Sequence, residues 1–214
     1  MDREVALEKI NLLRGVDLRE LARELEIEVF GPSGKKNKGW AGHVLEAYLG
    51  LPRNSSRAPN FGSWELKLVS LKQRGELVAV KETMAITMLD PKEVILQEFE
   101  TSHLYTKLRK LVVGARVWED TLESRSLFFG VEPFDLGDQD IYRTVKADYD
   151  EIRQNLLDGQ ALSGKLGKYV QPRTKGAGGN APKTRAFYMR PILIAHILGL
   201  KIIGEVESET DPLV

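Results

Sequence analysis

The sequence lacks cysteine, long apolar runs and any excess of charge of one sign. The absence of cysteine excludes disulfides and zinc sites built on thiolates, and it is typical of proteins in a reducing cytosol. The amino-terminal segment MDREVALEKI is charged and periodic, unlike a secretory signal, and no stretch is apolar enough to span a bilayer. We therefore expect a soluble cytoplasmic protein that does not enter the membrane. Its 214 residues suit one compact domain, or two lobes that flank a cleft.

Charge is balanced in total but unevenly distributed. The chain has 31 basic and 31 acidic residues, which argues against an indiscriminate polycation. The segment from Gly159 to Gly204 nevertheless contains no acidic residue. Its basic residues are Lys165, Lys168, Arg173, Lys175, Lys183, Arg185, Arg190 and Lys201. A solvated charged face is the ordinary explanation of a basic run, but an acid-free segment of this length with glycines and aromatic residues favours a nucleic-acid surface.

Hydrophobic spacing predicts an α/β protein with a central mixed sheet flanked by helices. Helices are predicted near residues 6–13, 17–25, 40–49, 101–111, 138–157 and 191–199. Strands are predicted at 63–70, 75–89, 112–118, 126–131, 168–173 and around Phe187, with the first two paired through the QRG turn. We interpret residues 1–135 as a catalytic lobe, 136–206 as a DNA-recognition lobe and 207–214 as a frayed tail.

The segment SWELKLVS carries the clearest chemical pattern. Side chains alternate across a strand, so Glu65 and Lys67 share one face, while Trp64, Leu66 and Leu68 face a core. Phosphodiester cleavage uses such a pair: a carboxylate holds a divalent cation, and a lysine positions or deprotonates water and neutralises developing charge. By itself E-x-K is a weak signal, because an ordinary strand with an exposed ion pair has the same pattern.

Neighbouring residues add to this pattern. Pro59-Asn60 stands upstream, where nucleases of the P-D…E-x-K type have their first metal-binding aspartate. Glu46 lies on the preceding predicted helix and Lys107 on a later one. Each of the two is also explained as a solvent-exposed helix residue. No complete phosphate-binding loop is present, since GQALSGKL ends in leucine where a hydroxyl is needed, and the three histidines are too scattered to predict a metal cluster.

Several blocks together resemble the MutH family of mismatch-repair endonucleases and related restriction enzymes that cut at GATC. Residues 38–50, KGWAGHVLEAYLG, are similar to that family's K-G-W-x-G-x-x-L-E-x-x-L-G block. WELK at 64–67 and ETSHLYTKL at 100–108 resemble two further blocks, and GKYVQPRTKG and AFYMR follow in the family's order. The resemblance runs through nearly the whole chain. It implies a restriction-endonuclease-like fold of the PD-(D/E)xK type.

The resemblance also implies roles for individual residues. Glu46, Glu65 and Lys67 are expected to be catalytic, with Lys107 assisting, and Mg²⁺ is the expected cofactor. Arg173, Lys175 and Tyr188 fall where the family contacts DNA, and arginine and lysine suit guanine edges and phosphates. Further DNA contacts are expected from Lys38 and Arg185. The expected metal ligands are Glu46, Glu65 and the residue at position 60.

Position 60 departs from the family pattern. Two residues fewer precede the E-x-K, so the family's aspartate corresponds to Asn60 or, with the gap placed differently, to Ala58. Asparagine offers a carbonyl oxygen but no negative charge, and hard cations favour carboxylates. The residue is either an inactivating substitution that traps uncut DNA, the interpretation we favour, or a natural variant. Either way, we expect good binding and poor cleavage.

Three functions are consistent with the sequence. We favour a type II restriction-like endonuclease that cuts double-stranded DNA at a short site as a monomer or transient dimer. The first alternative is a repair endonuclease that nicks one strand at GATC and is activated by a partner protein. The second alternative, from another class, is a DNA-binding protein without catalysis. The strand motif is common to the first two and therefore does not separate them.

Overall fold

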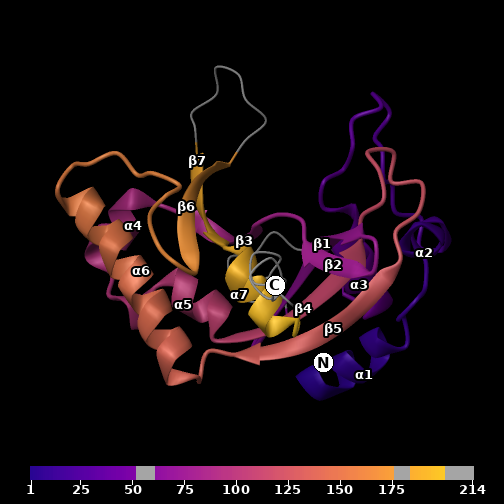
Figure 1. Ribbon diagram of the computed structural model, residues 1–214, viewed down its shortest axis with the longest axis horizontal. Helices are drawn as coiled ribbons and strands as arrows, with labels where there is room; N and C mark the ends of the chain where they lie inside the picture. The colour runs from indigo at the N-terminus through magenta and orange to yellow at the C-terminus, as the bar shows by residue number, and fades with distance from the viewer. Residues whose placement is uncertain (52–60, 176–183, 201–214) are drawn as a thin grey trace, which may run out of the picture.

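The computed structural model describes residues 1–51, 61–175 and 184–200 (Figure 1). The helices of this part are α1 (Arg3–Asn11), α2 (Leu18–Glu24), α3 (Trp40–Tyr48), α4 (Pro91–Leu96), α5 (His103–Leu108), α6 (Gln139–Leu157) and α7 (Pro191–Ile197), with a 3-10 turn at Phe99–Thr101. The strands are β1 (Glu65–Arg74), β2 (Leu77–Val80), β3 (Met84–Leu89), β4 (Lys110–Val117), β5 (Phe128–Asp135), β6 (Val170–Lys175) and β7 (Thr184–Met189). None of the described helices is long and apolar enough to cross a membrane.

Local sequence explains where several helices begin and end. The Asp17 carboxylate accepts a hydrogen bond from the Arg19 amide at the start of α2, and Asp138 caps α6 by accepting from two amides. Ser102 caps α5 by accepting from the Tyr105 amide at 3.1 Å. Just beyond the end of α6, Gly159 has φ +66°, a conformation that glycine adopts without strain.

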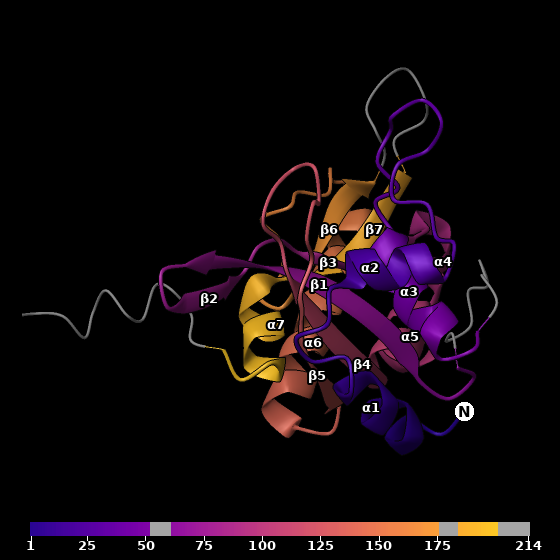
Figure 2. The same cartoon turned by 90° about the vertical axis from the view of Figure 1, so that its right-hand side faces the viewer.

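Two sheets form the frame of the molecule. The larger has the order β2-β1-β4-β5; β1 and β4 are parallel, and the other neighbours are antiparallel. This sheet is mixed and has helices on both faces, as the sequence predicted (Figure 1). The smaller sheet, β3-β7-β6, is antiparallel and was not predicted. The hairpin of β1 and β2 projects from the body of the molecule (Figure 2).

The predicted strand at 75–89 is wrong, because it is two strands in different sheets. β2 pairs with β1, whereas β3 pairs with β7 in the smaller sheet. Residues 81–83, Lys-Glu-Thr, connect the two strands and interrupt the apolar pattern, but this break does not indicate that the second half joins another sheet. The predicted helix at 101–111 is also too long, since Leu111 already belongs to β4.

The larger sheet separates two hydrophobic cores. One core contains Trp64, just before β1, and Leu66 of β1 with the buried faces of α1, α2 and α3. The other contains Val69 and Leu71 of β1, together with α6, α7 and the inner face of the smaller sheet. Both faces of β1 are therefore covered. Since Glu65 and Lys67 alternate with Leu66, they lie on the side of the second core.

Candidate active site

Glu65, Lys67 and Lys107 form a charged cluster at the start of β1. The Glu65 carboxylate receives Lys107 Nζ on Oε2 and Lys67 Nζ on Oε1, both at 2.8 Å. The side chains of Glu65 and Lys107 are 2% and 6% exposed, whereas that of Lys67 is 23% exposed. The structure thus brings together three of the predicted catalytic residues, and the partly exposed lysine is the one that meets the surface.

Packing around the cluster holds each residue in place. Just before Glu65, Trp64 is buried, stacks on Phe61 with ring centroids 3.8 Å apart, and donates from Nε1 to the Met1 carbonyl. Glu65 pairs with Leu111 of the adjacent parallel strand β4. Lys107 comes from α5, whose buried Leu104 and Leu108 pack in the core. Both sides of the carboxylate are therefore fixed by the fold rather than by a loop.

Lys67 is the member of this cluster that can meet a ligand from solvent. Its ammonium bonds to Glu65 at 2.8 Å, but its side chain is 23% exposed. An ammonium group at the surface is suited to an anionic ligand such as a phosphodiester.

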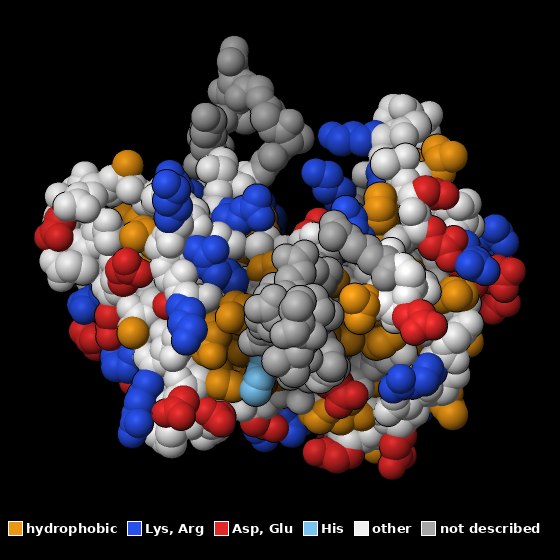
Figure 3. Space-filling model, viewed as in Figure 1, with side chains coloured by type: hydrophobic (Ala, Val, Ile, Leu, Met, Phe, Trp, Pro, Cys, Tyr) orange, Lys and Arg blue, Asp and Glu red, His pale blue; other side chains and the backbone are white. Residues whose placement is uncertain are grey.

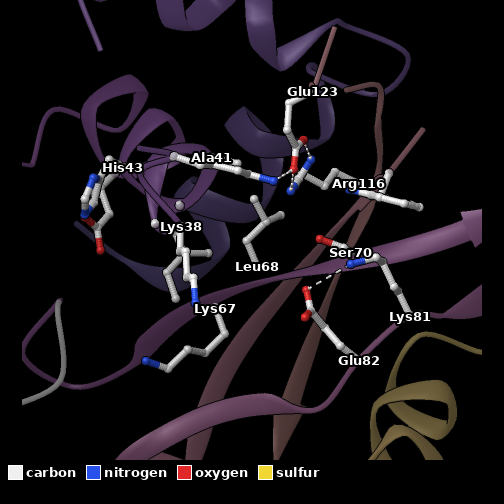
Figure 4. A pocket seen from close by; sticks show the side chains of 16 residues that line it. Lys38, Ala41, His43, Lys67, Leu68, Ser70, Lys81, Glu82, Arg116 and Glu123 are labelled. Carbon is white, nitrogen blue, oxygen red and sulfur yellow. Dashed lines mark hydrogen bonds and ion pairs between the residues drawn. The ribbon is translucent and has the colours of Figure 1, made fainter. Parts of the chain in front are cut away.

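A cavity of about 380 Å³ runs beside the first half of β1. Its lining includes Glu46 and His43 of α3, Lys38, and Lys67 of β1. Among the described residues, 65–70 have a strand partner on one side only, because β2 begins its pairing at Leu71. The cavity lies along this open edge. Lys38 and Lys67 point to one side of it in Figure 4.

A second ionic network, which sequence reasoning missed, lies in the wall of the same cavity. Glu123 is fully buried and accepts hydrogen bonds from Arg116 and Lys36 (Figure 4). Burial opposes ionisation of Glu123, but hydrogen bonds from the two cations outweigh it and lower its pKa. Arg116 also lies 5.3 Å from the Trp40 ring centroid. This network joins the 119–125 loop to the loop that carries Lys36.

Lys81 and Trp118 also line the cavity and were not singled out from the sequence. Lys81 follows β2 directly, and Trp118 follows β4. Their only signal in the sequence is a lysine and an aromatic residue that each come just after an apolar strand.

The predicted DNA-contacting residues of the basic segment gather on β6 and β7. Arg173 donates to Thr83 Oγ1 at 2.7 Å and lies 5.6 Å from the Tyr188 ring centroid. Lys175 is exposed and pairs with Thr184, and Arg185 lies beside it on β7. Tyr188 is half-buried, so the surface that it offers is limited. Figure 3 shows Lys and Arg side chains on both sides of a hollow between this region and the 31–38 loop.

The described residues include side chains of the type that bind a hard divalent cation, but too few of them lie together to hold one. Glu65 and Glu46 provide carboxylate oxygens, the ligands that Mg²⁺ prefers. No group of three acidic, histidine or cysteine side chains able to hold a metal occurs within residues 1–51, 61–175 and 184–200. Each Glu65 oxygen also bonds to a lysine, so a cation there would share the carboxylate with the two ammonium groups. Asn60 and Ala58 lie outside the described residues.

Comparison with known proteins gives matches to the MutH family. The family model described as "DNA mismatch repair enzyme MutH" matches residues 49–117, which include Glu65, Lys67 and Lys107. A DNA mismatch repair protein MutH from Vibrio campbellii is 27% identical, with 95% of both chains covered. That of Pasteurella multocida is 26% identical over 92% of this chain and 95% of its own. That of Actinobacillus pleuropneumoniae is 27% identical over 81% and 76%.

Solved structures also align with the chain. One of them is a restriction endonuclease, MvaI, in complex with its cognate DNA substrate, at 11% identity and a TM-score of 0.37. The alignment covers 89% of this chain and 96% of the other. This similarity is too low to add to the argument.

Proposed function

We propose, from the premise that this chain is a MutH-like endonuclease, that it hydrolyses phosphodiester bonds of double-stranded DNA at a short sequence. One observation carries the proposal: a buried carboxylate, Glu65, lies between two lysines at the open edge of β1. The cluster lies within the segment that the MutH family model matches. The partly exposed ammonium of Lys67 suits a DNA phosphate.

The exposure of each charged side chain indicates its role in the proposed reaction. Lys67, which reaches the surface, binds the scissile phosphate or orients the attacking water, and its charge offsets the negative charge that develops at phosphorus. Lys107 is buried and fixes the Glu65 carboxylate, so it acts through that residue. Glu65 and Glu46 would hold a divalent cation, Mg²⁺ in this proposal, which when bound polarises the phosphate as a Lewis acid.

The basic residues of β6 and β7 form the recognition surface of this proposal. Arg173 and Lys175 contact base edges or phosphates, and the Tyr188 ring holds the Arg173 guanidinium in position. Lys38, which is exposed beside the cavity, contacts the phosphates near the cut.

The relatives favour the repair hypothesis over the restriction hypothesis that we drew from the sequence. Their printed names are those of mismatch repair proteins, and two of the alignments cover more than nine tenths of both chains. We therefore propose nicking of one strand at GATC, with activation by a partner protein. A supercoiled plasmid distinguishes the hypotheses, because nicking gives open circles and double-strand cleavage gives linear DNA. The assay is run on plasmids with and without adenine methylation.

The Asn60→Asp variant tests the metal site. The added carboxylate raises affinity for the cation, so we expect Mg²⁺-dependent cleavage to increase by at least roughly tenfold. Asn54→Asp adds the same charge six positions away and serves as the matched control, while Ala58→Asp tests the other alignment. Equal cleavage by Asn60→Asp and the starting protein contradicts our placement of the metal site. Tight DNA binding with no cleavage by either aspartate variant at 58 or 60 favours the non-catalytic alternative.

A further inference from the structure

Lys81 stands at the end of the open edge of β1. Its backbone amide donates to the Ser70 carbonyl at 2.9 Å, which is the last contact of the β2 chain with β1 before residues 81–83 leave the sheet. Its side chain lines the same cavity as Lys67 and is 22% exposed. In Figure 4, Lys81 lies across the cavity from Lys38 and Lys67. The cavity thus has cationic groups at both ends.

The Lys81 ammonium is held on an aromatic ring. Its Nζ lies 4.4 Å from the Trp118 ring centroid, well within the range of a cation–π interaction. The main chain at Trp118 is anchored to β1, because its backbone amide donates to the Leu71 carbonyl at 2.8 Å. A ring orients an ammonium but accepts none of its charge. The lysine therefore remains cationic, and its N–H groups remain able to donate to an anion.

The neighbouring carboxylate does not neutralise this lysine. Glu82 Oε1 is 4.0 Å from Lys81 Nζ, beyond hydrogen-bonding distance, and the Glu82 side chain is 59% exposed. A pair of this kind contributes little. The contrast with Arg116 and Lys36 is clear, since those two cations of the same cavity bond directly to the buried Glu123.

Lys81 also lies between the candidate catalytic cluster and the strands with the basic residues. Along β1, Lys67 and Ser70 are three residues apart, or about 10 Å at the usual rise of a strand. Because the axial rise is about 3.4 Å per nucleotide and the backbone also winds around the axis, phosphates about 10 Å apart lie no more than about three nucleotides apart in one strand. In the other direction, Thr83 is only two residues beyond Lys81, and Arg173 of β6 donates to it. DNA that contacts both regions crosses the segment 81–83.

We propose that Lys81, held on Trp118, is a binding site for a DNA backbone phosphate within about three nucleotides of the cut. This inference rests on the proposed function, which supplies the DNA and the position of the cut. It adds a contact that the sequence motifs do not include. The site is sequence-independent, because a phosphate is the same at every base.

The test compares two lysines on the same ring. Lys72 Nζ lies 5.5 Å from the Trp118 centroid, but Lys72 does not line the cavity. Binding of a labelled duplex to wild type, Lys81→Gln and Lys72→Gln is measured in EDTA over a series of salt concentrations. For Lys81→Gln we expect roughly tenfold weaker binding and a plot of log K against log salt that is shallower by about 0.9. Lys72→Gln should match wild type in both, and melting curves verify that each variant is folded.

The outcomes separate the two proposals. If wild type binds no duplex, the proposed function fails and this inference fails with it. If wild type binds and Lys81→Gln has the same affinity and salt dependence, only this inference is overturned. The same holds if Lys72→Gln loses as much as Lys81→Gln, because the effect then belongs to general surface charge.

A second experiment locates the phosphate. Single phosphates of a GATC duplex are replaced by uncharged methylphosphonates, one position at a time. Neutralising the phosphate bound by Lys81 should weaken binding by wild type and leave Lys81→Gln unchanged. Equal losses for both proteins at every position would overturn the proposed contact. The Trp118→Leu variant should bind more weakly than Trp118→Phe, which keeps an aromatic face; the reverse order contradicts the role of the ring.

Discussion

Replacing Glu65 by glutamine should destabilise the protein more than replacing either lysine that bonds to it. In Glu65→Gln, the two ammonium groups remain and their anion is lost. Lys67 is 23% exposed and can turn to water, but Lys107 is 6% exposed and cannot. Removing one partner of a buried ion pair costs about 3–5 kcal/mol, so with the amide oxygen still accepting one bond we expect a loss of roughly 3 kcal/mol.

Variants of the two lysines give smaller losses of unfolding free energy, with which that of Glu65→Gln is compared. Lys107→Met removes one charge-assisted hydrogen bond of 2.8 Å, but Glu65 keeps its bond to Lys67. We expect a loss of about 1.5–2 kcal/mol there. Lys67→Met removes a partly exposed group and should cost less than about 1 kcal/mol. The double variant Glu65→Gln/Lys107→Met removes both charges of the Glu65–Lys107 pair. Its loss of unfolding free energy should therefore be smaller than the sum of the two single losses by about 2 kcal/mol.

Urea denaturation followed by tryptophan fluorescence measures these differences. Trp64 lies next to Glu65 in the chain and is buried, so its emission reports unfolding of this region. The expected order of destabilisation is Glu65→Gln, then Lys107→Met, then Lys67→Met. The reasoning is refuted if Glu65→Gln is as stable as Lys67→Met, or if the double variant loses the full sum.

Two further predictions concern other contacts. The pKa of Glu123 is lowered from 4.5, so its ionised form contributes stability above that pH, which is lost as the pH falls through the lower folded-state pKa. The difference in melting temperature between wild type and Glu123→Gln should therefore shrink below pH 4.5, and a constant difference would contradict this. In Gly167→Ala, the new Cβ would lie 1.8 Å from the Val170 carbonyl oxygen, at a φ of +75°. We expect thermal denaturation to show a loss of at least about 2 kcal/mol in unfolding free energy for Gly167→Ala. The control Gly137→Ala, whose Cβ meets nothing within 4 Å, should lose less than about 0.5 kcal/mol. Equal losses would show that the loop at Gly167 moves to accommodate the new Cβ.

The sequence predicted those features that depend on neighbouring residues. The helices predicted at 17–25, 101–111 and 138–157 begin within a residue or two of the expected positions, at the caps Asp17, Ser102 and Asp138. Such starts can be predicted because capping needs only a side chain and the amides two or three residues away. The shared face of Glu65 and Lys67 also follows from strand geometry alone, and their ion pair confirms it.

Features that depend on distant pairing were missed. Nothing in the stretch 75–89 signals that its second half pairs with β7, about a hundred residues later, because both halves have similar apolar patterns. The same reason applies to Glu123, whose partners Arg116 and Lys36 come from different parts of the chain. Lys107 was found through the family resemblance; its burial beside Glu65 could not be derived from the sequence, where it has the pattern of a surface lysine.

The shared core of the two sheets has a consequence for altering this protein. Val69, Leu71 and Val113 of the larger sheet pack in one cluster with Ile86, Phe187 and Met189 of the smaller sheet. The two sheets therefore share one hydrophobic core and form a single frame. Under the proposed function, such a frame sets a constant spacing between the bases that are recognised and the bond that is broken. Exposed residues of β6 and β7 can then be exchanged to retarget the enzyme while the cut stays at the same offset, provided that the inward-facing side chains of these strands are kept.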